Sequence, residues 1–469
     1  MKNIESKAHP YMPNSAGGKK TEMLNSIGYK NIDDLFKQIP AKHRIKKSLN
    51  LPNQLSSELD LKRHLLSILS KNSDCEKNLN FLGAGCWQHH VPSVCDEIIG
   101  RNEFLTNVWG TPSSDHGRNQ ALFEFCSLLG ELLKLDMVGL PVYSYGCAAG
   151  HAIRMASRIT GRKKIIVPKI IDPERNGVIK NYCEPEIMEE HIEILELDFD
   201  PNSGCIDINH LTKLLSRDVA GVYFEVPNYF GIIEKNCKNI SKLVSENDSV
   251  VIVGCDPISL GIIKPPVEYG ANIVVGPTQP LGIHMNCGGG VGGFIASHDD
   301  EKYVREYNTL NISITEHHLD GHFGFGLSLA GQTSYGLRES GKDWTGNSTY
   351  LWAISSAVYM ALLGPKGFKE VGEVIVQNSN FAAKKLSQIN GLKVYFNSSF
   401  FKEFLLNFDG TGLTVGFINE ELRKRNIFGG KDISKEFPEF GQSALYSITE
   451  IHTQNDIENL VNNLKEIIL

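Results

Sequence analysis

The sequence predicts an α/β protein whose large domain is built around a mainly parallel β-sheet. Apolar runs of strand length alternate with helical stretches between about residues 81 and 300. One such run, Val250–Val253, is wholly apolar and leads to Asp256, and a second, Ile273–Val275, follows after a short connection. Wholly apolar strands that alternate with helices are typical of a parallel sheet covered on both faces.

The elements follow in order along the chain. Before residue 80, apolar residues at helical spacing predict short helices, the clearest of them over residues 60–69. Strands are expected at residues 165–167, 192–195, 219–224, 250–253, 273–275 and 293–296. Residues 347–388 predict long helices, and the tail from about 392 predicts short strands and a closing helix over 456–467. We therefore expect an N-terminal helical arm (1–80), a large α/β domain (81–345), and linking helices with a small α+β C-terminal domain (346–469).

The composition is that of a soluble globular protein. The chain has 469 residues, of which 41% are hydrophobic and 22% charged, enough for two or three packed domains. A net charge of -7 argues against nucleic acid or an anionic membrane as the main partner. No apolar run reaches the ~18 residues of a membrane span, and residues 1–11 lack the apolar core of a signal peptide. The ten cysteines form no C-x-x-C pair, which suits reduced thiols, so we expect a cytoplasmic protein.

Asp256 is a candidate cofactor ligand. In pyridoxal-phosphate enzymes with an aminotransferase-like fold, an Asp at the end of such a strand pairs with the pyridine nitrogen, and a Lys after the next strand forms the Schiff base. Here no Lys occurs between Lys264 and Lys302. The chain is therefore expected to carry this scaffold without its covalent anchor. The other interpretation is that Asp256 merely caps the turn before Pro257.

A second candidate region lies at the predicted start of a helix, where Gly146, Cys147 and Ala148 are small. Small residues let backbone amides approach a phosphate at the positive end of a helix. The alternative is a tight turn between a strand and a helix. Together with Asp256, these three residues are predicted as a weak or vestigial cofactor site.

Histidines are weaker candidates. His89 and His90 follow a Gly-Ala-Gly turn and could face a substrate, although histidines are also common in turns. His317, His318 and His322 lie among glycines that predict a loop, and we expect no metal site.

Over nearly its whole length the chain resembles the glycine cleavage system P-protein family, in its N-terminal-half subunit. The likeness rests on the order and spacing of motifs that include Tyr11-Met12-Pro13-Asn14, Phe81-Leu82-Gly83-Ala84-Gly85, Pro227-Asn228-Tyr229-Phe230-Gly231, Asp256-Pro257, Lys264-Pro265-Pro266 and Ala361-Leu362-Leu363-Gly364-Pro365. The resemblance implies a pyridoxal-phosphate-dependent fold type I domain and a role in glycine decarboxylation. It further implies that the Schiff-base lysine belongs to a partner, the subunit 2-like chain. No cofactor is then held covalently on this chain, a lipoyl H-protein-like carrier accepts the product, and the assembly is a dimer or heterotetramer.

The chain departs from the family in three segments: residues 110–113, 338–344 and 276–279. If these face a pocket, they select the substrate. The candidates for substrate-facing loops are His89, His90, Thr111, Ser113, Gln279 and His284. The departures leave open a repurposed paralogue acting on another amino acid in specialised metabolism, or a non-catalytic partner subunit.

Overall fold

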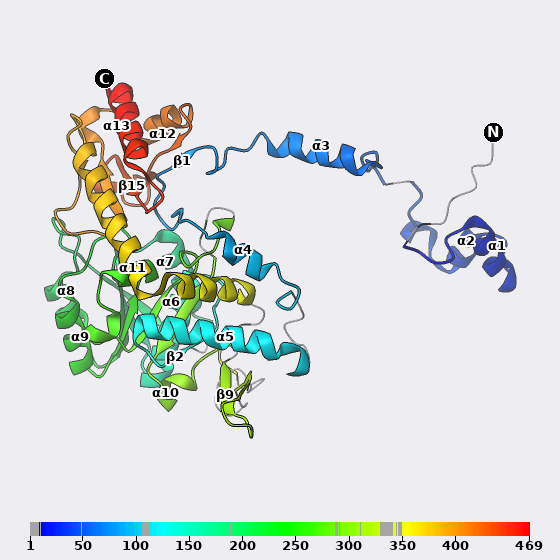
Figure 1. The fold of residues 1–469 in the computed structure, drawn as a ribbon, viewed down its shortest axis with the longest axis horizontal. Coiled ribbons are helices and arrows are strands. Elements are labelled where there is room, and N and C mark those ends of the chain that lie inside the picture. The colour runs from blue at the N-terminus through cyan, green and yellow to red at the C-terminus, as the bar shows by residue number, and fades with distance from the viewer. Residues whose placement is uncertain are drawn as a thin grey trace. The chain divides into compact units, whose positions relative to one another are not determined.

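The computed structural model describes most of the chain in two units, residues 1–73 and 74–469 (Figure 1). The described residues are 9, 11–47, 49–105, 112–187, 190–286, 289, 291–309, 311–328, 341–343, 345 and 349–469, with side chains omitted for 112–116. The boundary at 80 and the division at 345 that the sequence suggests stay predictions.

The first unit consists of short helices. They are α1 (Gly17–Ser26), α2 (Ile32–Leu35) and α3 (Glu58–Leu69), with single 3₁₀ turns at Phe36–Gln38 and Ala41–His43. Among its described apolar side chains, Leu24 alone is buried. Most of the other large apolar residues, including Leu61 and Leu65 of α3, are exposed, and Leu35 is partly buried. This unit therefore forms little hydrophobic core of its own.

The second unit is built around a seven-stranded sheet with the order β2-β8-β7-β6-β5-β3-β4. The strands are β2 (Met137–Val138), β3 (Lys164–Pro168), β4 (Glu193–Leu197), β5 (Val219–Glu225), β6 (Val250–Gly254), β7 (Ile273–Pro277) and β8 (Gly293–Ser297). β3 to β7 pair in parallel, and only the pairings of β8 with β7 and with β2 are antiparallel. The predicted α/β fold with a mainly parallel sheet is confirmed.

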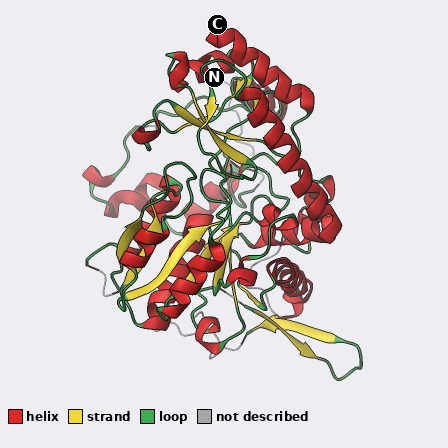
Figure 2. Ribbon diagram, turned by 90° about the vertical axis from the view of Figure 1, so that its left-hand side faces the viewer, coloured by secondary structure: helices red, strands yellow, loops and turns green. Residues whose placement is uncertain are grey.

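Helices cover both faces of this sheet (Figure 2). Side chains alternate between the faces of a strand, so Phe224 and Val253 join one core while Tyr223 and Ile252 join the other. The first core includes residues of α5 (Pro112–Leu133), α9 (Cys237–Glu246) and α11 (Tyr350–Leu386), and the second those of α6 (Tyr145–Thr160) and α7 (Pro173–Cys183). Wholly apolar strands follow from this two-sided burial.

The C-terminal part joins the large sheet through α11, which changes direction at Gly364 just before Pro365. A four-stranded antiparallel sheet has the order β11-β12-β15-β14, with β11 (Lys393–Val394), β12 (Glu403–Asn407), β14 (Lys431–Asp432) and β15 (Ser443–Ser447). The helices α12 (Val415–Arg423) and α13 (Gln454–Ile468) pack on it.

The remaining elements of this unit are short. They are α4 (Ser93–Ile99), α8 (Ile208–Leu214), α10 (Glu301–Val304), the parallel pair β1 (Leu79–Asn80) and β13 (Ile427–Phe428), and the hairpin β9 (Ile312–Glu316) and β10 (Phe323–Leu327). Within the described part of the chain, no helix has both the length and the apolar character needed to cross a membrane.

The start of β12 is tied to the loop after β5. The Phe401 N–H donates to the Gly231 carbonyl at 2.9 Å, and the Ile233 N–H donates to the Ser399 carbonyl at 3.0 Å. Gly231 has φ 77, and a side chain there would collide with the Glu403 carbonyl. This close crossing places the residues just before β12 at the carboxyl ends of the large-sheet strands.

We expect Gly231→Ala to lower the free energy of unfolding by about 2 kcal/mol more than Gly412→Ala does, because it adds a collision to the cost of positive φ. Gly412 also has positive φ (71) but open space around it, so it is the matched control. Urea denaturation of both variants measures the difference, and equal losses would contradict the proposed collision.

Candidate cofactor site

A cavity of about 500 Å³ lies where β5, β6 and β7 end. The amino end of α6, the turn around Gly85 and the segment Phe401–Glu403 complete its lining. Open α/β sheets bind ligands at the carboxyl ends of their strands. This cavity is therefore the place where the fold would hold a cofactor.

Asp256 lies at the end of β6 and performs two tasks. Its Oδ1 accepts a hydrogen bond from the Ile258 N–H at 3.0 Å, which caps the 3₁₀ turn Pro257–Gly261. Its Oδ2 lies 2.5 Å from the Lys402 Nζ. The capping role and the cavity-facing role considered for Asp256 thus belong to different oxygens of one carboxylate.

Lys402 was missed by sequence reasoning. It precedes β12, has φ 66 and is almost wholly buried. Its Nζ also lies 2.8 Å from the His89 Nε2 and 4.0 Å from the centre of the Trp87 ring. The one signal in the sequence is a Lys-Glu pair inside an apolar run from Phe400 to Leu406, because charged residues are rarely buried without partners.

The next residue, Glu403, is also buried and lines the cavity. Its Oε1 accepts a hydrogen bond from the Ala84 N–H at 2.6 Å. Burial raises the pKa of Glu403 to about 7, because a low-dielectric environment disfavours the charged form.

The amino end of α6 is occupied by its own cap. The Ser144 hydroxyl accepts a hydrogen bond from the Cys147 N–H at 3.1 Å, so this amide is already satisfied. Of the three predicted phosphate-site residues, Gly146 lines the cavity, whereas Cys147 is half-buried and Ala148 belongs to the second core.

Acidic side chains surround this end of the cavity. Arg175 lies over the Tyr145 ring and pairs with Glu225 at 3.0 Å and with Asp172 at 3.5 Å. Glu225 also accepts a hydrogen bond from the Tyr223 hydroxyl at 2.6 Å. The positive charge of Arg175 is therefore balanced by nearby carboxylates, although its buried Nε and Nη1 have no partner with hydrogen-bond geometry.

Gln279 occupies the turn after β7, where an enzyme of this class would carry its Schiff-base lysine. It lines the cavity, is buried, and donates a hydrogen bond from Nε2 to the Ile283 carbonyl at 2.9 Å. A carboxamide cannot form a Schiff base.

Of the other predicted residues, His89 and His90 lie together at Glu450, and His284 has a different partner. His89 is buried between Lys402 and Glu450, and the His90 N–H donates to Glu450 at 2.8 Å. His284 is exposed and pairs with Asp96. Thr111 and the side chain of Ser113 lie outside the described residues. The described residues contain no group of three or more His, Cys, Asp or Glu placed to hold a metal ion.

The residues of this cavity do not fit pyridoxal phosphate. The Asp256 oxygen that would face a ring nitrogen is paired with Lys402. At the amino end of α6 the Cys147 amide is already capped, and the carboxylates of Asp172, Glu174 and Glu225 line the cavity around Arg175, which disfavours a doubly charged anion there. The chain has the scaffold of the site but not its contacts.

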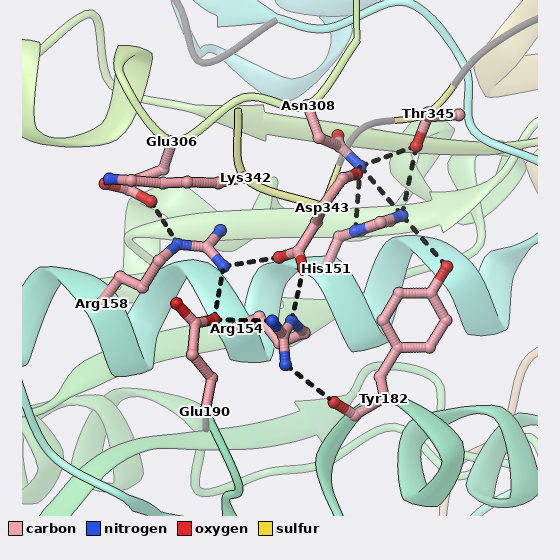
Figure 3. A network of polar contacts seen from close by, with 10 residues as sticks. All are labelled: His151, Arg154, Arg158, Tyr182, Glu190, Glu306, Asn308, Lys342, Asp343 and Thr345. Atoms are coloured by element: carbon pink, nitrogen blue, oxygen red, sulfur yellow. Dashed lines mark hydrogen bonds and ion pairs between the residues drawn. The ribbon is translucent and has the colours of Figure 1, made fainter. Parts of the chain in front are cut away.

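A separate polar network joins Asp343 and Thr345 to side chains of α6 (Figure 3). Arg154 and Arg158 hold the partly buried Asp343 between them, at 2.6 and 2.5 Å, and Arg158 also pairs with Glu306 at 2.5 Å. Lys342 and Asp343 of this departing segment are thus ion-paired, and the described residues 341–343 and 345 are absent from the cavity lining.

His151 completes the network, with Asn308 and Tyr182 within hydrogen-bond distance. Burial lowers its pKa to about 4. His151 is therefore a neutral hydrogen-bonding group at neutral pH and adds no charge to the arginine cluster.

Arg158→Met should lower the free energy of unfolding by about 2 kcal/mol, because Glu306 loses one of its two cationic partners and keeps only Lys342, while Asp343 keeps only Arg154. Arg101→Met is the control, since Arg101 forms an exposed pair with Glu103 and such pairs contribute little. Denaturant midpoints measure both variants, and an unchanged midpoint for Arg158→Met would contradict the stabilising role.

Solved structures with a similar fold define the class. A glycine decarboxylase (P-protein) of the glycine cleavage system, in inhibitor-bound form, superposes with a TM-score of 0.84 at 28% identity, covering 98% of this chain and 100% of that one. A sphingosine-1-phosphate lyase of Burkholderia pseudomallei superposes with a TM-score of 0.63 at 15% identity, covering 92% of this chain and 94% of that one. The fold is that of the pyridoxal-phosphate-dependent enzymes of fold type I.

Sequence comparison gives the family. The glycine cleavage system P-protein family matches residues 9–464. Relatives named probable glycine dehydrogenase (decarboxylating) subunit 1 are 39% identical in Staphylothermus marinus and 35% identical in Saccharolobus solfataricus, each covering 98% of both chains. This chain belongs to the glycine cleavage system P-protein family. Pyridoxal phosphate is the cofactor expected of that family, and nothing in these comparisons favours a paralogue acting on another amino acid.

Proposed function

We propose that this chain is the lysine-free subunit of a two-subunit glycine decarboxylase. It pairs with a second subunit that carries the Schiff-base lysine and anchors pyridoxal phosphate. The complex, a heterodimer or a heterotetramer in the cytoplasm, decarboxylates glycine and transfers the aminomethyl group to the lipoyl arm of an H-protein-like carrier. The observation that carries this proposal is the turn after β7, which places the buried Gln279 in the cavity and contains no lysine.

The names of the relatives support the same division of labour. A subunit 1 in those proteins implies a subunit 2. The contribution of this chain is to support and complete the partner's pocket, since charged groups that line its own cavity are engaged in internal ion pairs. The loops that depart from the family are the first candidates for contact with the substrate on the partner's side.

Reconstitution tests the proposal. This chain, a lysine-bearing subunit 2-like chain and a lipoylated carrier are assayed separately and together for glycine-dependent exchange of labelled bicarbonate. We expect exchange only when both chains are present. Exchange by this chain with the carrier alone would refute the proposal. A stable complex of the two chains that decarboxylates another amino acid but not glycine would also refute it.

Borohydride reduction in the presence of pyridoxal phosphate should leave no stoichiometric pyridoxyl-lysine on this chain, because the turn after β7 contains no lysine and Lys402 is paired with Asp256. Peptide mapping by mass spectrometry measures the adduct. The partner subunit, treated in parallel, is the positive control and should carry one labelled lysine. A stoichiometric adduct at Lys402 or at any other lysine of this chain would count against the assignment.

A further inference from the structure

Three groups of different chemistry surround the Lys402 ammonium. The Asp256 carboxylate lies 2.5 Å away, the His89 Nε2 lies 2.8 Å away, and the face of the Trp87 ring has its centre 4.0 Å away. An ammonium has three N–H donors and is attracted to the face of an indole. Two acceptors and one aromatic face therefore form a complete shell for a primary ammonium.

This shell is buried and internally braced. The exposed fractions are 1% for Lys402, 7% for Asp256, 8% for His89 and 9% for Trp87. The His89 Nδ1 lies 2.8 Å from a Glu450 oxygen, so a ring that donates from Nδ1 presents Nε2 to the ammonium as an acceptor. Burial raises the pKa of Glu450, but its contacts with His89 and the His90 N–H outweigh burial and lower that pKa to about 2. Glu450 is therefore ionised and holds the ring in this orientation.

The backbone at Lys402 is bent to deliver the side chain. Lys402 has φ 66, an uncommon conformation for a residue with a side chain. The surrounding structure maintains it: the Lys402 carbonyl accepts the Ile448 N–H at 2.9 Å, and Phe401 is tied to Gly231 on the other side. A conformation of this kind persists only where neighbouring contacts impose it.

In enzymes of this fold, the Asp at the end of the strand pairs with the ring nitrogen of the cofactor. We propose that Asp256, His89 and Trp87 form a primary-ammonium site that Lys402 fills from within the chain, in the place where the fold would hold the cofactor's ring nitrogen. The Lys402 side chain thus keeps the ring away from Asp256 and joins the C-terminal part to the large sheet. Each pair of subunits then has only one place for the cofactor, on the partner. The ammonium site is a property of this chain alone and goes beyond the proposed function, whichever substrate the complex uses.

The test empties the site and refills it. Lys402→Ala removes the part of the side chain that corresponds to n-propylammonium. We expect this variant of the full chain to unfold at a temperature several degrees below that of the wild type. Millimolar n-propylammonium chloride should restore at least half of the loss, whereas 1-propanol and sodium chloride at the same concentration should not. The double variant Lys402→Ala/Asp256→Asn should show no such recovery, and neither should Lys431→Ala, which shortens the other lysine that lines the cavity.

A folded Lys402→Ala chain that n-propylammonium does not stabilise would overturn the proposal, and so would equal recovery with 1-propanol, which fills volume without charge. If Lys402→Ala does not fold, reductive methylation of the wild-type chain tests whether the Lys402 ammonium is held in the site. Lys402 should stay unmodified while Lys431 reacts, also with pyridoxal phosphate present. Methylation of Lys402 at the rate of Lys431 would show that the ammonium is not held in the site. None of these readouts depends on glycine exchange, so they stand or fall separately from the proposed function.

Discussion

Asp256→Ala is expected to lower the free energy of unfolding by about 3 to 5 kcal/mol, because the Lys402 ammonium would remain buried without its carboxylate. The two groups lie 2.5 Å apart and both are buried. His89 would be the only remaining acceptor close to the ammonium among the described contacts. Urea denaturation followed by circular dichroism measures the loss.

Two further variants make this result specific. Asp256→Ala/Lys402→Met removes both charges and should recover a large part of the stability, because replacing a buried ion pair by apolar groups costs little. Glu22→Ala breaks the exposed pair with Lys19 and should leave the denaturation midpoint unchanged. A double variant that is no more stable than Asp256→Ala would mean that the loss comes from the missing cap of the turn at Ile258 rather than from the unpaired ammonium.

Glu403→Gln is expected to remove a pH dependence of stability that the wild type shows between about pH 4.5 and pH 7. Burial raises the pKa of Glu403 from the ordinary 4.5 to about 7. The folded state therefore keeps a proton that the unfolded state has released, and stability is full below pH 4.5 and falls as the pH rises to about 7. The difference corresponds to about 3 kcal/mol, at 1.36 kcal/mol for each unit of pKa.

Unfolding free energies at pH 5 and pH 8 test this expectation. Between pH 5 and pH 8 the free energy of unfolding should fall more for the wild type than for Glu403→Gln. The difference in stability between the two proteins therefore shifts in favour of the variant as the pH rises. Glu450 does not contribute to this pH dependence. Its pKa is lowered in the folded state, so it affects stability only below pH 4.5, the ordinary pKa of a glutamate. Glu450→Gln is thus a suitable control and should keep the decline between pH 5 and pH 8. Parallel curves for the wild type and Glu403→Gln would contradict the raised pKa.

Much of the fold could be predicted from local patterns. The wholly apolar run at 250–253 became β6, and the predicted helices at 60–69 and 456–467 became α3 and α13 with slightly wider bounds. The spacing of apolar residues within a short window indicates whether the segment is a helix or a strand and which of its faces is buried. This information lies in neighbouring residues, so it can be taken from the sequence alone. The missing lysine was equally plain, because the turn after β7 is a continuous segment that can be read directly.

The candidate site was predicted only in part. Asp256 and Gly146 do line the cavity, since each lies at the end of a strand or the start of a helix whose place in a parallel sheet is fixed. His89 was considered as a substrate-facing residue, but its ring lies between Glu450 and Lys402. The partners of His89 come from segments far away in the sequence, and no local pattern links them.

The sequence by itself determined three features: the parallel sheet, the carboxylate at the end of β6 and the absence of an anchoring lysine. Each of them depends only on residues that are close together in the sequence. Only the tertiary structure decided what that carboxylate binds. The chain brings Lys402 from the start of β12, against Gly231 and over Trp87, into the place that the fold reserves for a ring nitrogen. A buried charge requires a partner of opposite sign, but which partner it meets depends on how two separately patterned parts of the chain pack together.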